Sequence, residues 1–290
     1  MSRAIFSQPT QLSLQQSFEI HVRRPAFFRR RAAVAVGHRD NLTQDNMFPI
    51  QDSVPSRSVP VVTRALIFIN VIVFFFELML PQQSIDQVFY LFGIVPARFT
   101  HPEWAAYVGF PVDSYWPLLT YQFLHGGWLH IIFNMWTLWI FGDNVEDRMG
   151  PVRFAIFYLL CGVLAGLTQL LTNPDSTVPS VGASGAIAGV LGAYLLLFPT
   201  ARLVVMFPIF FFPFFFELPA VLYLGFWFFS QLFSGTLALA GPQQVGGIAW
   251  WAHVGGFLSG MLLCWLFVRR RRQLQPDEYG VEWAWEPRSR

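Results

Sequence analysis

Lysine is absent from this sequence of 290 residues, and all 19 basic residues are arginines. This absence excludes a serine–lysine catalytic dyad, a Schiff-base lysine and the lysine of a P-loop. Charged residues make up only 12% of the chain, about half the usual share of a globular protein. Cysteine is scarce too: Cys161 and Cys264 both lie inside apolar stretches, where a buried free thiol is favoured over a disulfide.

Three catalytic signatures are also missing. The sequence has no His-Glu-x-x-His zinc motif, and no pair of aspartates lies inside its apolar runs. Ser184 is followed two residues later by Ala186, so the Gly-x-Ser-x-Gly nucleophile elbow is absent. These absences exclude the usual zinc and aspartyl proteases and the α/β-hydrolases.

Apolar residues dominate what remains. Hydrophobic residues form 54% of the chain, and several runs approach the ~20 residues that a helix needs to cross a bilayer. The pattern predicts an all-α polytopic membrane protein. Its six predicted transmembrane helices lie at about residues 60–80, 128–145, 152–171, 184–198, 217–233 and 248–268.

Two further stretches are assigned to the membrane interface. Residues 82–121 mix polar and aromatic residues, as is typical of a loop at that level. Residues 203–216 are apolar, but they are too short and too rich in proline to span the bilayer.

The arginines predict the orientation of the helices. One set of helix ends carries Arg57, Arg64, Arg148, Arg153, Arg202 and Arg269 to Arg272. The opposite ends carry only Arg98, so the positive-inside rule places both termini in the cytoplasm.

The chain divides into a cytoplasmic N-terminal tail (1–58), a six-span domain (59–268) and a cytoplasmic C-terminal tail (269–290). Residues 1–58 are polar and rich in arginine, which favours disorder. A transit peptide and a true start at Met47 are the alternatives for this region.

Unusual polar residues recur near the outer ends of the second, fourth and sixth predicted helices. His130 and Asn134 share one helix face, four residues apart. Ser184 opens the fourth helix, and His253 lies near the start of the sixth. Taken singly, each has a structural interpretation: a serine bonded to its own helix, or a clasp between helices. Their common depth instead predicts one site, because polar groups in a bilayer face a bundle interior.

Glycines follow both of the predicted reactive residues. Gly185 and Gly189 come after Ser184, and Gly256 and Gly260 come after His253. Small residues four apart let helix backbones approach. We therefore expect the fourth and sixth helices to touch at these glycines, which would bring two short side chains within hydrogen-bond distance.

This set of residues suits peptide hydrolysis. Ser184 would attack the carbonyl, and His253 would accept its proton and pass it to the leaving amine. No carboxylate is evident beside His253, so a dyad is predicted. His130, the amide of Asn134 and the backbone N–H of Ser184 can donate to the oxyanion.

At these residues the sequence resembles the rhomboid family of intramembrane serine proteases. The matching motifs are Gly182-Ala183-Ser184-Gly185, Ala252-His253-Val254-Gly255-Gly256 with Gly260, and His125 through Asn134. The resemblance covers about residues 64–268. It implies a six-helix bundle, a Ser184/His253 dyad and an oxyanion site with His130, Asn134 and Gly182. The fifth helix and the loop before the sixth would form a lateral gate.

Two positions depart from relatives. Ala188 stands where some relatives carry an aromatic residue that stacks on the histidine, and Trp116-Pro117 replaces a Trp-Arg pair. The first departure leaves the packing of the His253 ring open.

The resemblance implies a serine-type endopeptidase that cleaves single-span membrane proteins within or near the membrane. It implies no cofactor, no metal and no nucleic-acid partner. A bacterial inner membrane is expected, with the site open to the extracytoplasmic side. The alternative is a catalytically inactive rhomboid-like protein that binds membrane clients.

Overall fold

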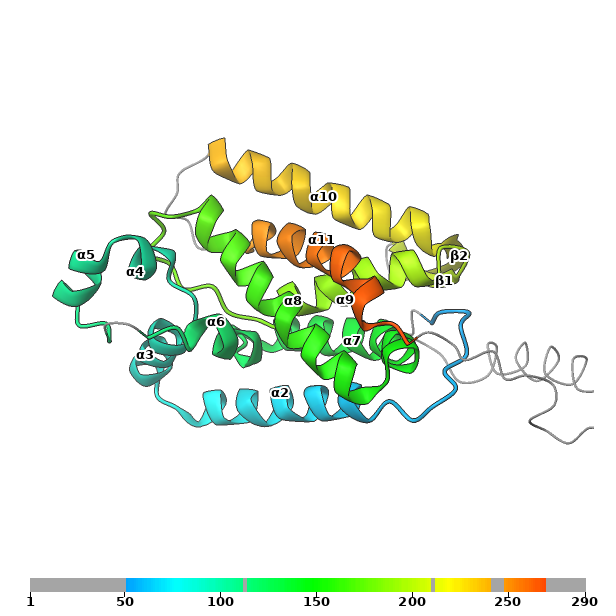
Figure 1. Ribbon diagram of the computed structural model, residues 1–290, viewed down its shortest axis with the longest axis horizontal. Coiled ribbons are helices and arrows are strands. Elements are labelled where there is room, and N and C mark those ends of the chain that lie inside the picture. Colours follow the sequence, from blue (N-terminus) through cyan, green and yellow to red (C-terminus); the bar gives the residue numbers. More distant parts are fainter. Residues whose placement is uncertain (1–50, 112–113, 210–211, 241–247, 270–290) are drawn as a thin grey trace, which may run out of the picture. The chain divides into compact units, whose positions relative to one another are not determined.

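Helices dominate the computed structural model, which describes residues 51–111, 114–209, 212–240 and 248–269 (Figure 1). Nearly all of the two predicted tails, with the question of a start at Met47, lies outside the described residues. The helices are α2 (Val61–Met79), α3 (Gln82–Phe92), α4 (Pro96–Thr100), α5 (Pro102–Tyr107), α6 (Pro117–Thr120), η2 (Tyr121–Phe123), α7 (Trp128–Met149), α8 (Pro151–Thr172), α9 (Ser184–Leu197), α10 (Ala220–Ala240) and α11 (Trp250–Phe267).

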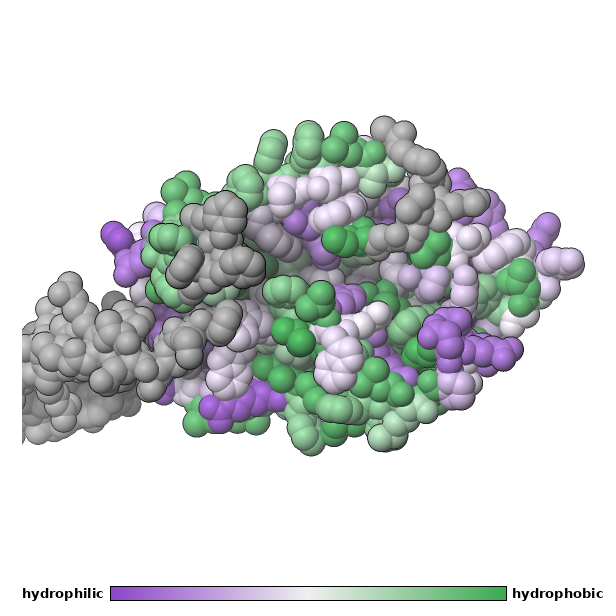
Figure 2. Space-filling model, turned by 180° about the vertical axis from the view of Figure 1, so that it is seen from behind, coloured by the Kyte–Doolittle hydropathy of each residue, from purple (hydrophilic) through white to green (hydrophobic). Residues whose placement is uncertain are grey.

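Four of the described helices, α2, α8, α10 and α11, are long and apolar enough to cross a membrane. Their outward faces carry large exposed hydrophobic side chains, such as Phe76 on α2 and Phe226 on α10. The lower and upper hydrophobic margins of the surface in Figure 2 lie over α2 and α10, respectively. Exposed apolar area of this extent is typical of a lipid-facing surface.

The remaining two predicted spans form helices at the predicted places. α7 carries four charged residues near its C-terminal end, and α9 has only 14 residues. At 1.5 Å per residue α9 extends about 21 Å, less than the ~30 Å hydrocarbon layer. Every α9 residue from Gly185 to Tyr194 is buried by the surrounding helices. It is therefore the central helix of the bundle, and its outer surface does not have to match the bilayer.

Glu146, near the end of α7, caps the start of α2. Its carboxylate accepts hydrogen bonds from the backbone N–H groups of Val62 and Thr63, at 2.9 and 2.8 Å, and from the Thr63 hydroxyl. The first N–H groups of a helix lack intrahelical partners, and a negative charge is favoured beside them. This contact fixes α2 against α7.

The all-α prediction is wrong between α9 and α10, where the chain forms a two-stranded antiparallel hairpin. β1 (Arg202–Ile209) pairs with β2 (Phe212–Pro219), and Pro208 lies opposite Pro213. The prolines cannot continue a helix, and the β-branched and aromatic residues around them favour extended backbone. The fifth long helix consequently begins at Ala220 rather than at about residue 217.

A short N-terminal segment continues this sheet. The Ser53 N–H donates to the Arg202 carbonyl at 2.9 Å, and the Val204 N–H donates to the Gln51 carbonyl at 2.8 Å. Between them the Asp52 carboxylate accepts hydrogen bonds from the Asn144 amide of α7 and the Tyr194 hydroxyl of α9. Residues from the stretch assigned to the tail thus contact the central helix.

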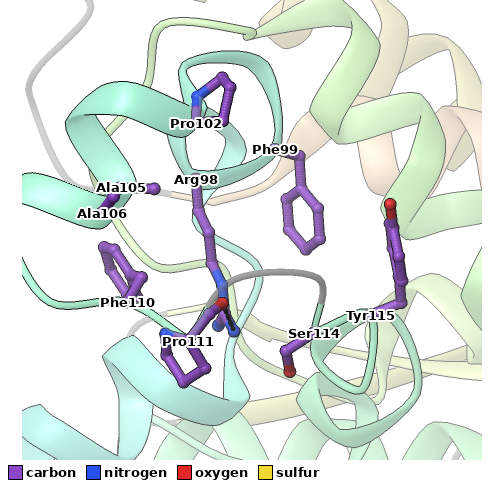
Figure 3. Close-up of a pocket in the computed structure, with 9 residues that line it drawn as sticks. All are labelled: Arg98, Phe99, Pro102, Ala105, Ala106, Phe110, Pro111, Ser114 and Tyr115. Atoms are coloured by element: carbon purple, nitrogen blue, oxygen red, sulfur yellow. Dashed lines mark hydrogen bonds between the residues drawn. The ribbon is translucent and has the colours of Figure 1, made fainter.

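The connection between α2 and α7 is held by one arginine. The Arg98 guanidinium donates to the carbonyls of Leu91 and Pro111, at 3.0 and 3.5 Å, and lies over the Phe110 ring (Figure 3). This region was predicted as an interfacial loop, and in the structure it contains α3 to α6. Arg98 provides an anchor for a connection that lacks the Trp-Arg pair of some relatives.

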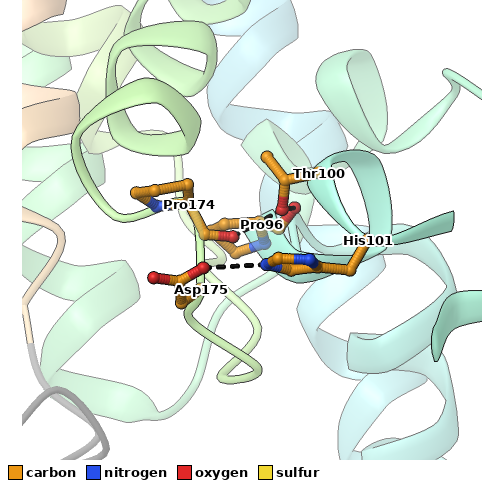
Figure 4. A network of polar contacts seen from close by, with 5 residues as sticks. All are labelled: Pro96, Thr100, His101, Pro174 and Asp175. Atoms are coloured by element: carbon orange, nitrogen blue, oxygen red, sulfur yellow. Dashed lines mark hydrogen bonds and ion pairs between the residues drawn. The ribbon is translucent and has the colours of Figure 1, made fainter.

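The same connection is tied to the loop that follows α8 (Figure 4). His101 Nε2 lies 2.8 Å from Asp175 Oδ1, and the Thr100 hydroxyl donates to the Pro174 carbonyl at 2.6 Å. Ile94 and Ser180 exchange two backbone hydrogen bonds in an antiparallel bridge. The segment that leads into α9 is therefore positioned by its contacts with the connection between α2 and α7.

We predict that Asp52→Asn stabilises the protein at neutral pH. Burial raises the pKa of Asp52 from 3.8 to about 6, although the Tyr194 hydrogen bond opposes the shift. The folded state then binds more protons than the unfolded state between these values, so wild-type stability falls as pH rises through 4 to 6. In detergent at pH 7.5 the variant should be more stable by roughly 1–2 kcal/mol at this partly exposed site, and its thermal midpoint should be correspondingly higher. Near pH 4 the two midpoints should be equal.

Asp86→Asn is the matched control, because Asp86 is exposed on α3, where it contacts Gln82. Its thermal midpoint should stay close to that of the wild type at pH 7.5. A midpoint for Asp52→Asn below that of the wild type at pH 7.5 would contradict the expectation.

Candidate active site

Ser184 is the first residue of α9, and the backbone before it requires glycine. Gly182 has φ = +131°, a conformation that side chains disfavour, and its N–H donates to the Tyr121 carbonyl at 2.9 Å. A Cβ at this position would lie only 2.6 Å from His130 Nε2. Gly182 therefore permits both the turn into α9 and the close approach of α7.

His253 of α11 contacts Ser184 directly. The distance from His253 Nε2 to Ser184 Oγ is 2.8 Å, although the two residues are 69 positions apart in the sequence. His253 is 9% exposed, and Ser184 is partly buried. A hydroxyl and an imidazole nitrogen at this distance have the geometry in which the imidazole can accept the hydroxyl proton.

Glycine permits the close packing of the two helices that carry this pair. A Cβ at Gly256 would lie 2.0 Å from the Gly185 carbonyl oxygen, and one at Gly260 would lie 1.9 Å from the Gly189 carbonyl oxygen. The α11 glycines thus face the α9 backbone. Helices normally lie 8–10 Å apart, and only residues without side chains allow contact of this kind.

The α9 glycines pack against α8 as well as against α11. A Cβ at Gly185 would lie 2.7 Å from Ala165 Cβ, and one at Gly189 would lie 2.5 Å from Cys161 Cβ, so both glycines face α8 first. A third glycine, Gly192, was not predicted: its Cβ would lie 2.2 Å from the Phe257 carbonyl oxygen of α11. The spacing of Gly185, Gly189 and Gly192, four and then three residues apart, could have indicated that Gly192 also lies at a helix contact.

His130 and Asn134 lie on α7 beside the turn at Gly182. A Cβ at Gly182 would meet His130 Nε2 and then Asn134 Nδ2, at 2.6 and 3.7 Å. The four predicted polar residues, drawn from α7, α9 and α11, thus lie around one turn of backbone. Each of them occurs within the first two turns of its helix.

His125, which was not among the predicted site residues, orients the Asn134 amide. Asn134 Nδ2 lies 3.1 Å from His125 Nε2, and Glu77 of α2 accepts a hydrogen bond from the His125 backbone N–H. Burial lowers the pKa of His125 to about 3, so its ring is neutral at physiological pH and Nε2 can accept from the amide. One Asn134 N–H is used in this way, and the second is left for another acceptor.

The His253 ring is packed by aromatic residues from outside α9. The Trp227 ring of α10 lies 5.8 Å from it between centroids at an interplanar angle of 33°, and the Trp250 ring meets it edge-on at 6.3 Å. Ala188 is fully buried in the core. Trp227 therefore provides the ring support that the sequence, with alanine at 188, left open.

Gln231 of α10 is the second residue near His253 that the sequence did not predict. Its Oε1 lies 2.8 Å from His253 Nδ1, so both ring nitrogens have polar partners. The available signal was weak: Gln231 is a polar residue in the middle of an apolar helix, four positions after a tryptophan.

This architecture defines a mostly helical integral membrane protein with a serine–histidine contact at the start of its central helix. Comparison with known proteins identifies the family to which the chain belongs. A family model described as the Rhomboid domain matches residues 112–270. The chain belongs to the rhomboid family, as its motifs predicted.

Named relatives have both active and inactive descriptions. The chain is 43% identical to Rhomboid protease GluP of Bacillus subtilis over 82 residues, which is 28% of the chain and 16% of the relative. It is 31% identical to the mitochondrial Rhomboid protein 1 of Saccharomyces cerevisiae over 163 residues, 53% of the chain and 43% of the relative. It is 34% identical to Inactive RHOMBOID-like protein 8 of Arabidopsis thaliana over 80 residues, 28% of the chain and 22% of the relative. The matched parts cover less than half of each relative, and family membership alone does not separate a protease from an inactive protein.

We predict that Gly260→Ala disrupts the contact between α9 and α11. The added methyl would overlap the Gly189 backbone, which cannot move aside as a side chain can. Overpacking of this kind costs about 1–3 kcal/mol or more, so the thermal midpoint in detergent should fall by several degrees.

Gly225→Ala on α10 is the matched control, because a Cβ there would have no atom within 4 Å. It should leave the midpoint unchanged or raise it slightly, since alanine favours the helix. Equal midpoints for the two variants would show that the close contact does not constrain the fold.

Proposed function

We propose that this protein is an intramembrane serine endopeptidase in which Ser184 is the nucleophile and His253 the general base. The observation that carries the proposal is the 2.8 Å separation of His253 Nε2 and Ser184 Oγ. The inactive rhomboid-like alternative is less favoured, because this chain retains both residues and holds them in contact.

In the first half of the reaction His253 Nε2 accepts the Ser184 proton while Oγ forms a bond to the carbonyl carbon of the substrate. The electron pair of the carbonyl moves to its oxygen and gives a tetrahedral oxyanion. As the intermediate collapses, the C–N bond breaks and the imidazolium Nε2–H protonates the departing amine. A water molecule, deprotonated by the same nitrogen, then hydrolyses the acyl-enzyme and restores Ser184.

Donors for the oxyanion lie around the same turn. The Ser184 N–H is at the N-terminus of α9, where the helix dipole favours negative charge. Asn134 has one amide hydrogen beyond the one directed to His125, and His130 lies beside Gly182. Removing a single donor of this kind costs about 2.7–4 kcal/mol of transition-state stabilisation.

The proposed membrane arrangement has six spans, made by α2, α7, α8, α9, α10 and α11. The arginine distribution supports cytoplasmic termini and a site that opens to the extracytoplasmic side. His253 contacts Ser184, and His130 lies beside Gly182, so site residues near the starts of three helices meet at one turn of backbone. This juxtaposition supports a single depth for the chemistry. The proposed location is a bacterial inner membrane.

Single-span membrane proteins are the proposed substrates, and the lipid bilayer is the proposed surrounding. Exposed phenylalanines on α2 and α10 support the contact with lipid. The chemistry of the Ser184–His253 pair requires no cofactor or metal, and nothing in the proposal involves nucleic acid.

We predict that a fluorophosphonate probe labels the detergent-solubilised protein and that Ser184→Ala abolishes the labelling, because the hydroxyl oxygen forms the bond to phosphorus. Ser259→Ala on α11 is the matched serine control and should label as the wild type does. Equal labelling of wild type and Ser184→Ala would remove the nucleophile assignment.

Cleavage of a reconstituted single-span substrate gives a second test. His253→Ala should stop cleavage while the protein still folds, because no general base remains. Asn134→Ala should lower kcat by about 100-fold, since other oxyanion donors remain. A wild-type protein that binds the substrate without cleaving it would favour the inactive client-binding alternative.

A further inference from the structure

We propose that Gln231 of α10 is a positioning residue for His253, one that fixes the tautomer the general base requires. This inference rests on the proposed function, because the tautomer matters only if His253 accepts a proton from Ser184. Gln231 would act through His253 and would not touch the substrate.

The requirement follows from the chemistry of imidazole. A neutral ring carries one hydrogen, on Nδ1 or on Nε2. If Nε2 is to accept the Ser184 proton, the hydrogen must reside on Nδ1, and an acceptor at Nδ1 favours that form. Gln231 Oε1 lies 2.8 Å from Nδ1, and the two side chains are only 6% and 9% exposed, so water competes weakly for the position.

A chain of hydrogen bonds on α10 fixes which end of the amide faces the ring. The Ser230 hydroxyl donates to the Trp227 carbonyl at 2.6 Å, which uses its only hydrogen. Its oxygen is then an acceptor, and Gln231 Nε2 donates to it at 2.9 Å. With the nitrogen of the amide engaged there, the oxygen is the end that meets His253 Nδ1.

The same face of α10 also supports the ring by packing. Trp227 and Gln231 are four residues apart and therefore lie on one side of the helix. The centroid of the Trp227 ring lies 5.8 Å from that of the His253 ring, and Gln231 Oε1 lies within hydrogen-bond distance of His253 Nδ1. One helix thus restrains both the orientation of the ring and its protonation pattern, the two roles of the third residue in a serine protease triad.

The titratable neighbour of His253 in the part of the chain that the structure describes is His130 of α7. From α9 comes Ser184, from α10 come neutral Trp227 and Gln231, and from α8 come neutral Thr168 and Gln169 beside adjacent positions of α11. Substitutions at Gln231 leave all these other groups in place, so a change in the titration of His253 would report the loss of this one contact.

The first measurement is the pH dependence of kcat/KM for cleavage of the model substrate. Gln231→Leu removes the acceptor, destabilises the imidazolium and should move the acid limb to lower pH. Gln231→Glu places a carboxylate at Nδ1 and should move it to higher pH by roughly 1 unit or more. Gln231→Leu should lower kcat about 10- to 100-fold with little change in KM, because general base catalysis contributes 10²–10⁴-fold in all. Gln231→Glu should retain more of kcat.

The second measurement does not depend on activity. In protein labelled with ¹⁵N-histidine, the wild type should show His253 with a protonated Nδ1 and a free Nε2, and Gln231→Leu should show a mixture. His253→Ala identifies the signals. If the wild type and Ser184→Ala both fail to react with the fluorophosphonate, the proposed function fails, whereas the tautomer assignment is still decided by these spectra.

Gln169→Leu is the matched control. Gln169 Oε1 accepts a hydrogen bond at 3.3 Å from the backbone N–H of Ala252, one residue before His253. The hydrogen bonds of the His253 ring among the described residues go to Gln231 and Ser184 instead. This variant should keep the wild-type tautomer and acid limb. An active protein in which Gln231→Leu also keeps both would overturn the inference. If Gln231→Leu does not fold, an unshifted acid limb in Gln231→Glu would overturn it as well.

Discussion

The fold depends on direct contact between the backbones of α9 and α11. Two short side chains can form a hydrogen bond across a helix pair only if the helices lie closer than side chains normally permit. Gly256 and Gly260 provide that approach on α11, where any Cβ would overlap carbonyl oxygens of α9. The contact explains why α9 is so poor in large residues at its start.

Much of this could be predicted from the sequence because the membrane limits the alternatives. Apolar length located the long helices, and the cost of polar groups in lipid identified Ser184, His253, His130 and Asn134 as residues that must face inward. Glycine spacing indicated that the fourth and sixth helices touch. The structure brings these four side chains to one turn of backbone, and their chemical roles stay a proposal.

For other parts of the structure, the sequence did not predict which residues far apart along the chain contact each other. The hairpin at 202–219 was missed because an apolar run with prolines is compatible with several structures, and strand pairing is a contact between residues far apart along the chain. Gln231 and His125 were missed for a related reason: their roles depend on the rotation of α10 and on the loop before α7. Neither rotation nor loop path follows from hydrophobic periodicity.

The support of His253 by α10 has a consequence for access to the site. α10 is bordered on its outer face by lipid-exposed phenylalanines, and it carries both Trp227 and Gln231. Any ligand that pushes α10 away from α11 would weaken the contacts that align His253. The energy regained when those contacts form again would favour the return of α10 to its position against α11. Entry of a ligand beside α10 and proton transfer at His253 would then be thermodynamically linked through the Gln231 side chain. The proposed protease would be least reactive while α10 is displaced, and water entering at that moment would meet a histidine that Gln231 no longer orients.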